Sequence, residues 1–192
     1  PNINALLMGS VSDSLKSEEF NNLSSYLNRG GSLFLSQSRI KTNLQVQQAL
    51  PIQSNIFSLL NSYGLDLQSN LVIDEICGRV NVQQQMGPIR MNVPIEYPLL
   101  PVIRNFNADE SIVAGLEQMQ LIFASEIKQD SASMGSVNFQ PLFYTSDNSG
   151  ELRGNFNLNP DPQQNPFTWL QVPTCMKALV VGSFCNLLKV WE

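Results

Sequence analysis

Histidine is missing from all 192 positions of the sequence. A cysteine or serine nucleophile in the common hydrolase triads needs an imidazole to accept its proton near neutral pH, so both triad chemistries are excluded. A zinc site with histidine ligands is excluded for the same reason. Ser-Lys and carboxylate chemistry stay open, although no lysine stands in a recognisable Ser-x-x-Lys catalytic setting.

Charge is also scarce. Charged residues make up 14% of the chain, against a usual share of about 25%, and the net charge is −5. An acidic chain without a cluster of Lys or Arg repels phosphate backbones, so nucleic acid is not an expected partner. The loop 9–14 precedes a predicted helix as a phosphate loop would, but it lacks a second glycine and the Gly-Lys-Ser/Thr ending. We therefore expect no nucleotide and no other cofactor.

Long apolar runs are absent too. A bilayer span needs about 20 apolar residues, and the longest candidate, 179–188, is short and interrupted by polar residues. Pro1 is not an initiator and no signal segment precedes it, so we expect an excised domain of a longer protein. Cys77, Cys175 and Cys185 lack metal-ligand spacing, so no metal site is predicted and buried free thiols are the favoured interpretation.

The most strongly patterned stretch is an amphipathic helix that ends at a glycine. Phe20, Leu23 and Leu27 recur at a spacing that places apolar side chains on one helical face. Gly30 is suited to the left-handed conformation that ends a helix. The apolar run Leu33–Leu35 that follows is typical of a strand buried on both faces.

This pattern occurs twice. Asn4–Met8 forms a predicted strand before the first helix, and 56–63 forms a second apolar helical face that ends at Gly64. Asn70–Asp74 then supplies a third apolar strand. A strand joined to the next by a helix favours parallel pairing with a right-handed crossover, so we expect a layered α/β domain spanning 1–192.

The remaining chain is less regular. Residues 77–84 and 89–93 alternate on either side of a Met-Gly-Pro turn and predict a projecting hairpin. Three prolines hold 94–101 extended as an arm. The other predicted segments are a long loop or weak helix at 37–51, a brief helix from Asp109 or Ser111 to Leu116, a strand at 119–124, an edge strand at 137–144, a long loop at 147–168 and a final strand at 177–182.

Polar residues follow each of the three predicted strands. Ligands of open parallel sheets bind beyond the carboxyl ends of the strands, so these residues are the predicted ligand-binding crevice. They are Ser10, Ser12, Asp13, Gln37, Arg39, Asp74 and Glu75. Residues 10–13 can instead cap the helix and form a turn. Asp74 and Glu75 can instead be solvated, and Asp74 can pair with Arg39 or Arg79.

The proline-bearing arm offers a second candidate surface. Tyr97, Leu99 and Leu100 stand on a rigid extended segment, which loses little entropy when it binds a partner. The alternative is that the arm packs across its own domain.

Four stretches together carry a family resemblance. They are the helix ending Tyr26-Leu-x-x-Gly-Gly31, Asn61–Leu65 with Leu71–Asp74, Glu96–Pro101 and Leu142–Ser146. In order and spacing the chain resembles the auxiliary domain of gliding-motility ABC transport proteins, the GldG-like family related to the amino-terminal domain of an intraflagellar-transport subunit. Ser36-Gln37 stands where that family commonly has Asp-Pro, and Gly182-Ser-Phe184 only loosely matches its acidic turn.

The resemblance implies a function and a setting. It implies a non-enzymatic, extracytoplasmic auxiliary domain, similar to a substrate-binding domain, in a gliding-motility or secretion-associated ABC transport system. Its partners would be the permease and ATPase subunits or other membrane-complex proteins, with ATP hydrolysed by a different subunit and a homodimer also open. The periplasmic domain would be tethered to the inner membrane by segments outside this chain.

The sequence thus predicts an α/β fold, a mainly parallel sheet with helices on both faces and an added β-hairpin. The resemblance and the pattern together imply a flavodoxin-like or class I glutamine amidotransferase-like architecture. Two other functions stay open. One is a sugar- or peptide-binding module with an aromatic platform near Tyr97 or Trp169, and the other is a hydrolase that uses the carboxylates of Asp13, Asp74 and Glu75.

Overall fold

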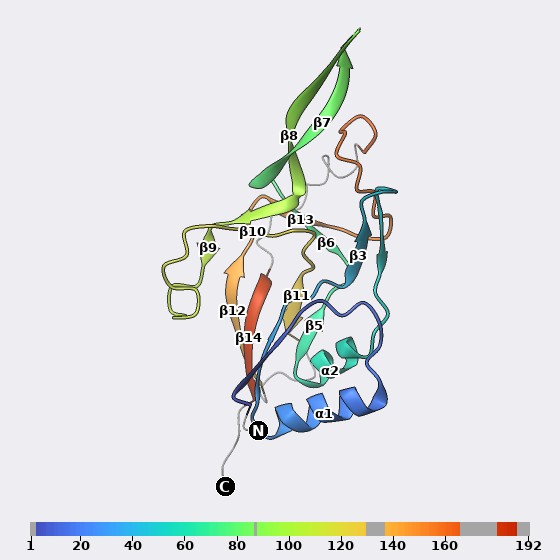
Figure 1. Ribbon diagram of the computed structural model, residues 1–192. Coiled ribbons are helices and arrows are strands. Elements are labelled where there is room, and N and C mark those ends of the chain that lie inside the picture. The colour runs from blue at the N-terminus through green and yellow to red at the C-terminus, as the bar shows by residue number, and fades with distance from the viewer. Residues whose placement is uncertain (1–2, 87, 130–136, 166–179, 188–192) are drawn as a thin grey trace.

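Strands make up most of the regular structure, at 43% of the residues against 12% in helices. The computed structural model describes residues 3–86, 88–129, 137–165 and 180–187 (Figure 1). The helices in these ranges are α1 (Ser17–Asn28) and α2 (Ile56–Ser62). The strands are β1 (Ala5–Met8), β2 (Ser32–Leu35), β3 (Ile40–Asn43), β4 (Gln48–Pro51), β5 (Leu65–Leu67), β6 (Leu71–Asp74), β7 (Cys77–Met86), β8 (Ile89–Ile103), β9 (Asn105–Phe106), β10 (Met119–Gln120), β11 (Ile127–Gln129), β12 (Val137–Tyr144), β13 (Ser149–Leu152) and β14 (Val180–Leu187).

The sheets are small and mostly antiparallel. Among the described strands, only β1 and β2 pair in parallel, whereas β5 with β11, β6 with β13, β7 with β8 and β12 with β14 are antiparallel. The prediction of an α/β fold with a mainly parallel sheet, flavodoxin-like or amidotransferase-like, is therefore wrong. The described helices do not cover both faces of a sheet either, because α1 and α2 lie together at one end of the molecule (Figure 1).

The helix of the first unit forms as the sequence predicts, but the strand after it is not buried on both faces, because Phe34 is 65% exposed. Helix α1 buries Leu23, and the backbone N–H of Lys16 donates to the Glu19 carboxylate, 2.9 Å away, at its start. Gly30 has a φ of 87°, the left-handed conformation expected at a helix end. The chain then returns as β2 and pairs in parallel with β1, with Leu6 opposite Leu33.

The second unit departs from the first after its helix. Gly64 again takes a positive φ, 80°, after α2. The chain enters β5 at once, and β5 pairs antiparallel with β11 rather than with β2. Strand β6 pairs with β13, which lies inside the predicted loop 147–168. The parallel sheet fails because these partners come from late in the chain, where nothing local indicates them.

Several smaller predictions also need correction. The predicted loop 37–51 contains the hairpin of β3 and β4, and the predicted helix up to Leu116 is a series of turns. Only Met119–Gln120 of the predicted strand 119–124 is a strand. The predicted edge strand, β12, lies between β14 and β9. The final strand begins at Val180, and 177–179 lie outside the described residues, as does Trp169.

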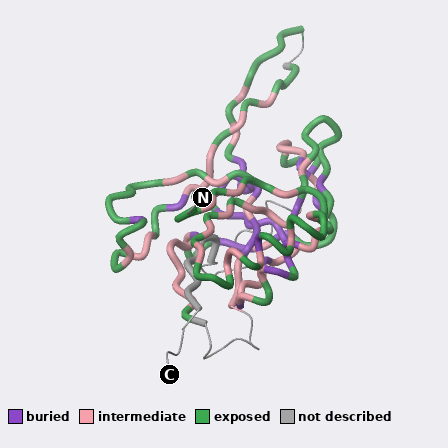
Figure 2. Tube along the Cα trace, turned by 60° about the horizontal axis from the view of Figure 1, so that its bottom comes forward, coloured by how far each residue is buried: buried purple, intermediate pink, exposed green. Residues whose placement is uncertain are grey.

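The predicted hairpin is confirmed. Strands β7 and β8 pair from Met86 and Ile89 at the turn down to the body, from which the hairpin projects (Figure 1). Most of its outer part is exposed, whereas buried residues gather in the body (Figure 2). Val82 lies opposite Val93 and Gln83 opposite Asn92, so one face of the ribbon is largely apolar and the other polar.

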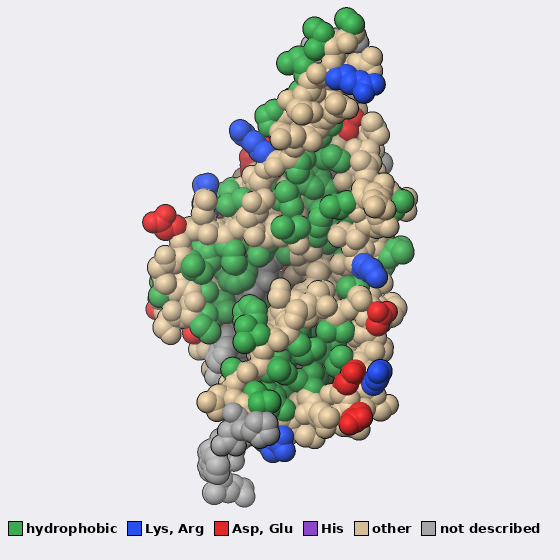
Figure 3. Space-filling model, viewed as in Figure 1, with side chains coloured by type: hydrophobic (Ala, Val, Ile, Leu, Met, Phe, Trp, Pro, Cys, Tyr) green, Lys and Arg blue, Asp and Glu red, His purple; other side chains and the backbone are tan. Residues whose placement is uncertain are grey.

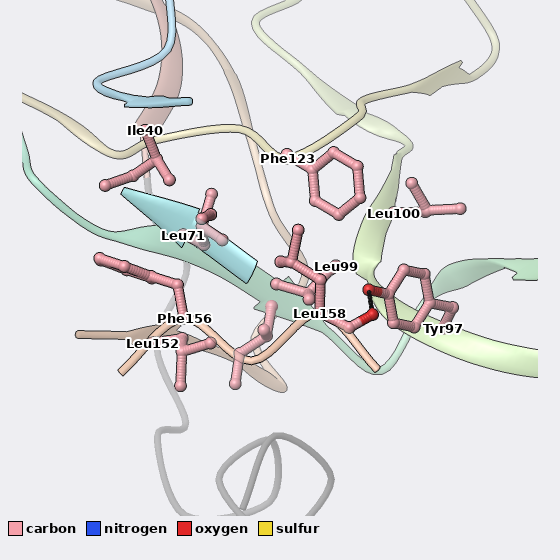
Figure 4. Packing of buried hydrophobic residues seen from close by; sticks show 11 residues of the cluster. Ile40, Leu71, Tyr97, Leu99, Leu100, Phe123, Leu152, Phe156 and Leu158 are labelled. Atoms are coloured by element: carbon pink, nitrogen blue, oxygen red, sulfur yellow. Dashed lines mark hydrogen bonds between the residues drawn. The ribbon is translucent and has the colours of Figure 1, made fainter. Parts of the chain in front are cut away.

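The main core lies where the hairpin meets the body. It joins side chains from β6, β8, β13, the β3–β4 hairpin and the segment 156–158 (Figure 4). Its buried members are Ile40, Ala49, Leu71, Ile73, Tyr97, Leu99, Leu100, Phe123, Leu152, Phe156 and Leu158. A second cluster packs α1 and α2 against β1, β2 and β5.

The proline-bearing arm belongs to this core. Tyr97 and Leu99 are 4% and 0% exposed, and Leu100 is 9% exposed. The hydroxyl of Tyr97 donates to the carbonyl of Leu158 over 2.6 Å, the contact drawn in Figure 4. Burial raises the pKa of Tyr97, which keeps this donor protonated. The structure thus places the predicted interaction surface inside its own domain, held by packing and by this hydrogen bond.

Candidate functional site

The predicted crevice beyond β1 and β2 is filled by a side chain of its own. The amide of Gln37 accepts from the backbone N–H of Val11 at 2.6 Å and donates to its carbonyl at 3.1 Å. This brings the loop that carries Ser10 and Ser12 against the end of β2, as parallel pairing requires. Both serines are exposed. The amide of Gln37 is therefore used in joining the two strand ends.

Arg39 pairs with Asp66 rather than with the acid that the sequence suggests. Its guanidinium donates to the carbonyl of Leu67 at 2.8 Å, lies 3.9 Å from the Asp66 carboxylate and stacks 4.9 Å from the centre of the Phe57 ring. These contacts fix Arg39 between α2 and β5. The expected ion pair with Asp74 does not form, because the β6 end that carries Asp74 faces a different part of the chain.

Asp74 and Glu75 point to different environments, as neighbours at a strand end do. Asp74 is fully buried, and its carboxylate accepts from the backbone N–H groups of Ser146 and Ile76 at 2.8 and 2.9 Å and from the Ser146 hydroxyl. Glu75 is exposed and accepts from the Asn148 amide at 2.6 Å. The Asp74 carboxylate therefore closes a turn, with its oxygens already occupied.

The structure does not gather the predicted acids into one catalytic pair. Asp13 is exposed near the start of α2, where its carbonyl accepts from the Ser54 hydroxyl at 2.9 Å. Asp74 instead contacts the turn before β13. Among the ends of the three predicted strands, the structure joins the first two, where Gln37 bonds to the loop that carries Ser10 and Ser12.

A buried polar network was not predicted. The side-chain amide of Asn70, which is fully buried, donates to the carboxylates of both Glu126 and Glu151. Lys128 lies 3.3 Å from Glu126, and Arg153 lies 2.7 Å from Glu151. Each carboxylate thus has its own cation as well as the shared amide. The arrangement suits a structural role for both side chains. Its members lie far apart in the sequence, which hides the network from local pattern analysis.

The Glu151 carboxylate makes stability depend on pH. The hydrogen bond from Arg153, aided by Asn70 and opposed by burial, lowers its pKa from 4.5 to about 2. A lowered pKa in the folded state adds stability above pH 4.5, which is lost as the pH falls towards 2. We expect the stability difference between the wild type and Glu151→Gln to shrink across that range in urea unfolding. A difference that stays constant with pH would contradict this.

An open groove runs between the hairpin and the loop 157–165. It has a volume of about 520 Å³. The described residues of its walls are mostly amides, with one carboxylate and no Lys or Arg. They are Gln47, Val82, Gln83, Gln84, Gln85, Asn159, Pro160, Asp161, Gln163 and Gln164.

The loop wall of the groove is held in shape by its own hydrogen bonds. The backbone N–H of Asp161 donates to the Asn159 side chain at 2.9 Å, and the N–H of Asn159 donates to the Asn157 side chain at 2.9 Å. The backbone N–H of Leu158 donates to the carbonyl of Gln47 at 2.8 Å, which ties the loop to the β3–β4 hairpin. The wall is therefore formed before any ligand binds.

The groove chemistry suits binding. Amide side chains donate and accept hydrogen bonds but do not titrate in the working pH range. The carboxylate of Asp161 already accepts from the N–H of Gln163 at 3.0 Å and from the Gln164 amide at 3.2 Å. Both walls of the groove are visible in the sequence as polar stretches, one the run Gln83–Gln85 and the other the loop 157–165. No local pattern indicates that these two stretches lie side by side in the fold.

On the face shown in Figure 3, acidic and basic side chains lie among one another, and neither sign of charge forms a patch of its own. In the parts of the chain that the structure describes, no group of three His, Cys, Asp or Glu side chains could hold a metal ion. No helix there has the length and apolarity needed to cross a bilayer.

Comparison with known proteins identifies a family. The model of a protein family described as an ABC-type uncharacterized transport system, labelled as an auxiliary component, matches residues 1–184. No curated protein and no solved structure matches the chain.

Proposed function

We propose, from the premise that this chain belongs to the family of ABC-type uncharacterized transport systems, that it is their non-enzymatic, extracytoplasmic binding domain. The family name makes it an auxiliary component with transporter partners in a membrane. The finer assignment, to gliding motility or secretion and to the periplasmic side, is part of the proposal. The match over 1–184 is the observation that supports a role in ABC-type transport.

The groove between β7 and the loop 157–165 supports binding as the mode of action. Its lining offers hydrogen-bonding amides and a single carboxylate that is already bonded. Acid–base catalysis needs a group whose protonation changes near the working pH, and amides do not supply one. A domain of this kind would act by holding a partner or a transported molecule while another subunit hydrolyses ATP.

Purification of the whole complex tests this function. The full-length protein, tagged and expressed in its own host, would be crosslinked in intact cells and isolated in detergent. We expect one ABC permease and one ABC ATPase subunit to be recovered with it in comparable amounts. An unrelated membrane-anchored protein with the same tag is the control, because it passes through the same membrane environment.

Protease treatment of cells with a permeabilised outer membrane tests the location. If the domain is extracytoplasmic, it is digested while a cytoplasmic marker protein stays intact. Recovery of no ABC subunit above the control would overturn the proposed role, and protection of the domain until the inner membrane is lysed would overturn the proposed location.

A further inference from the structure

Strand β7 lies at one end of its sheet. The described strands order as β10, β8 and β7, so β7 pairs with β8 along one edge only. Natural sheets usually protect such an edge with Lys, Pro, a bulge or a covering element. Residues 80–86 contain neither Lys nor Pro and pair with β8 in unbroken register. This part of β7 is therefore a regular edge with none of those protective residues.

A proline in β8 shows which backbone groups of β7 point outward. Residues in an antiparallel pair alternate between positions that exchange hydrogen bonds and positions that do not. Asn81 lies opposite Pro94, which has no N–H to exchange, so this is a non-bonded pair. By alternation, Gln83 and Asn92 form another. The N–H and C=O groups of Asn81 and Gln83 therefore point away from β8.

The groove faces this same edge. Val82 and Gln83 send their side chains to opposite faces of the hairpin, yet both line the groove. The lining takes in the consecutive β7 residues 82–85 and no described residue of β8, which places the cavity along the outer edge of β7. The outward backbone groups of β7 thus meet a space whose far wall is the amide-rich loop 159–164.

We propose that this groove binds a single extended polypeptide segment of a partner protein, which adds to β7 as a new antiparallel or parallel strand. The inference rests on the proposed function and names the class of partner. Backbone hydrogen bonds to Asn81 and Gln83 supply affinity, and the amide side chains of the loop contact the outer edge of the added strand. The apolar face of the hairpin, with Val82 and Val93, favours alternating apolar and polar residues in the segment.

The charge of the lining and the width of the groove indicate which kind of polypeptide fits. Among the described residues of the lining, Asp161 is the one with a charged side chain, and the chain carries a net charge of −5, so an uncharged or basic segment is favoured over an acidic one. A second copy of this chain would bring its own β8 beside its β7, which needs two strand widths, about 10 Å. The loop 159–164 forms a second wall on that side, so a single strand is the better fit.

A peptide selection tests the proposal on the purified chain. Random peptides of about ten residues, the upper length of ordinary strands, would be displayed on phage and selected on the immobilised chain. The most enriched peptide would be synthesised and its Kd measured by calorimetry. We expect hydrogen exchange at the Asn81 and Gln83 amides to slow on binding, while the Asn92 amide on the opposite edge keeps its rate.

Two proline variants, at Gln83 and at Asn92 opposite it, test whether the peptide binds the edge of β7 or the edge of β8. Gln83→Pro removes an outward N–H of β7, and we expect it to raise the Kd of the peptide about tenfold or more, since its carbonyl partner is left unbonded. Asn92→Pro removes an outward N–H on the other edge and should leave the Kd unchanged. Both should fold, because Pro94 occupies an equivalent position in the same hairpin.

Equal binding by Gln83→Pro and wild type would overturn the proposal, as would unchanged exchange at Asn81 and Gln83 in the peptide complex. A concentration-dependent dimer that Gln83→Pro abolishes, with no peptide enriched, would overturn it in favour of a second copy. Recovery of the ABC subunits alongside any of these results would leave the proposed function standing, so the two proposals fail separately.

Discussion

Replacing Asp74 by Ala is expected to lower the free energy of unfolding by about 3 kcal/mol. The carboxylate is fully buried and accepts two backbone N–H groups and the hydroxyl of Ser146. Alanine offers no acceptor, so three partly buried hydrogen bonds are lost at a fully buried position. Urea unfolding followed by circular dichroism measures the change.

The neighbouring acid provides the matched control. Glu75 is exposed, so Glu75→Ala should change the stability by less than about 0.5 kcal/mol. Asp74→Asn keeps the shape and one acceptor oxygen, and it should fall between the two. If Asp74→Ala were as stable as Glu75→Ala, the turn between β6 and the segment that holds Ser146 would not depend on this carboxylate.

Leu99→Ala is expected to cost about 3 kcal/mol, within the range measured for buried leucines. Leu99 is fully buried and lies at the centre of the main core, among side chains from β6 and the segment 156–158 (Figure 4). Truncation removes apolar contacts and leaves a cavity, because rigid strands on several sides limit collapse. The unfolding midpoint in urea should fall with an unchanged slope.

The same substitution at an exposed leucine is the control for Leu99→Ala, because it changes the same residue type outside the core. Leu50 in β4 is 72% exposed, so Leu50→Ala should cost less than about 1 kcal/mol, the span of strand propensity. Equal losses for the two variants would mean that the arm carrying Leu99 does not pack into the core. The original expectation of a docking surface at Tyr97, Leu99 and Leu100 would then deserve a new test.

Local patterns predicted the elements whose causes are local. The apolar spacing in α1 and the glycine that follows it predicted both a helix and its end, and Gly30 takes the positive φ that this requires. The hairpin of β7 and β8 was predicted because its turn and its alternation lie within a short stretch. The β1–β2 pair formed in parallel because one helix joins the two strands.

The candidate site could not be predicted in the same way. The sequence placed ligand residues beyond three parallel strands, but β6 pairs antiparallel with β13 instead. The carboxylate of Asp74 accepts a hydrogen bond from Ser146, which lies 72 positions later in the chain. The groove combines Gln83 with Asn159 and Asp161, which no local pattern links. The turn at Asp74 and the groove both depend on contacts between segments that are distant in sequence. Bringing such segments together costs chain entropy, and this cost is offset only by the packing of the whole fold.

By itself, the sequence determined the helix ends, the projecting hairpin and the exclusion of imidazole chemistry, because each depends on residue type and near neighbours. The tertiary structure alone decided which strands pair, that the arm with Leu99 is buried, and that the edge of β7 faces an amide-lined groove. The physical reason is that a strand carries the same alternation whichever partner it takes. Its partner is chosen by long-range packing, so that only the folded chain shows which edge stays open.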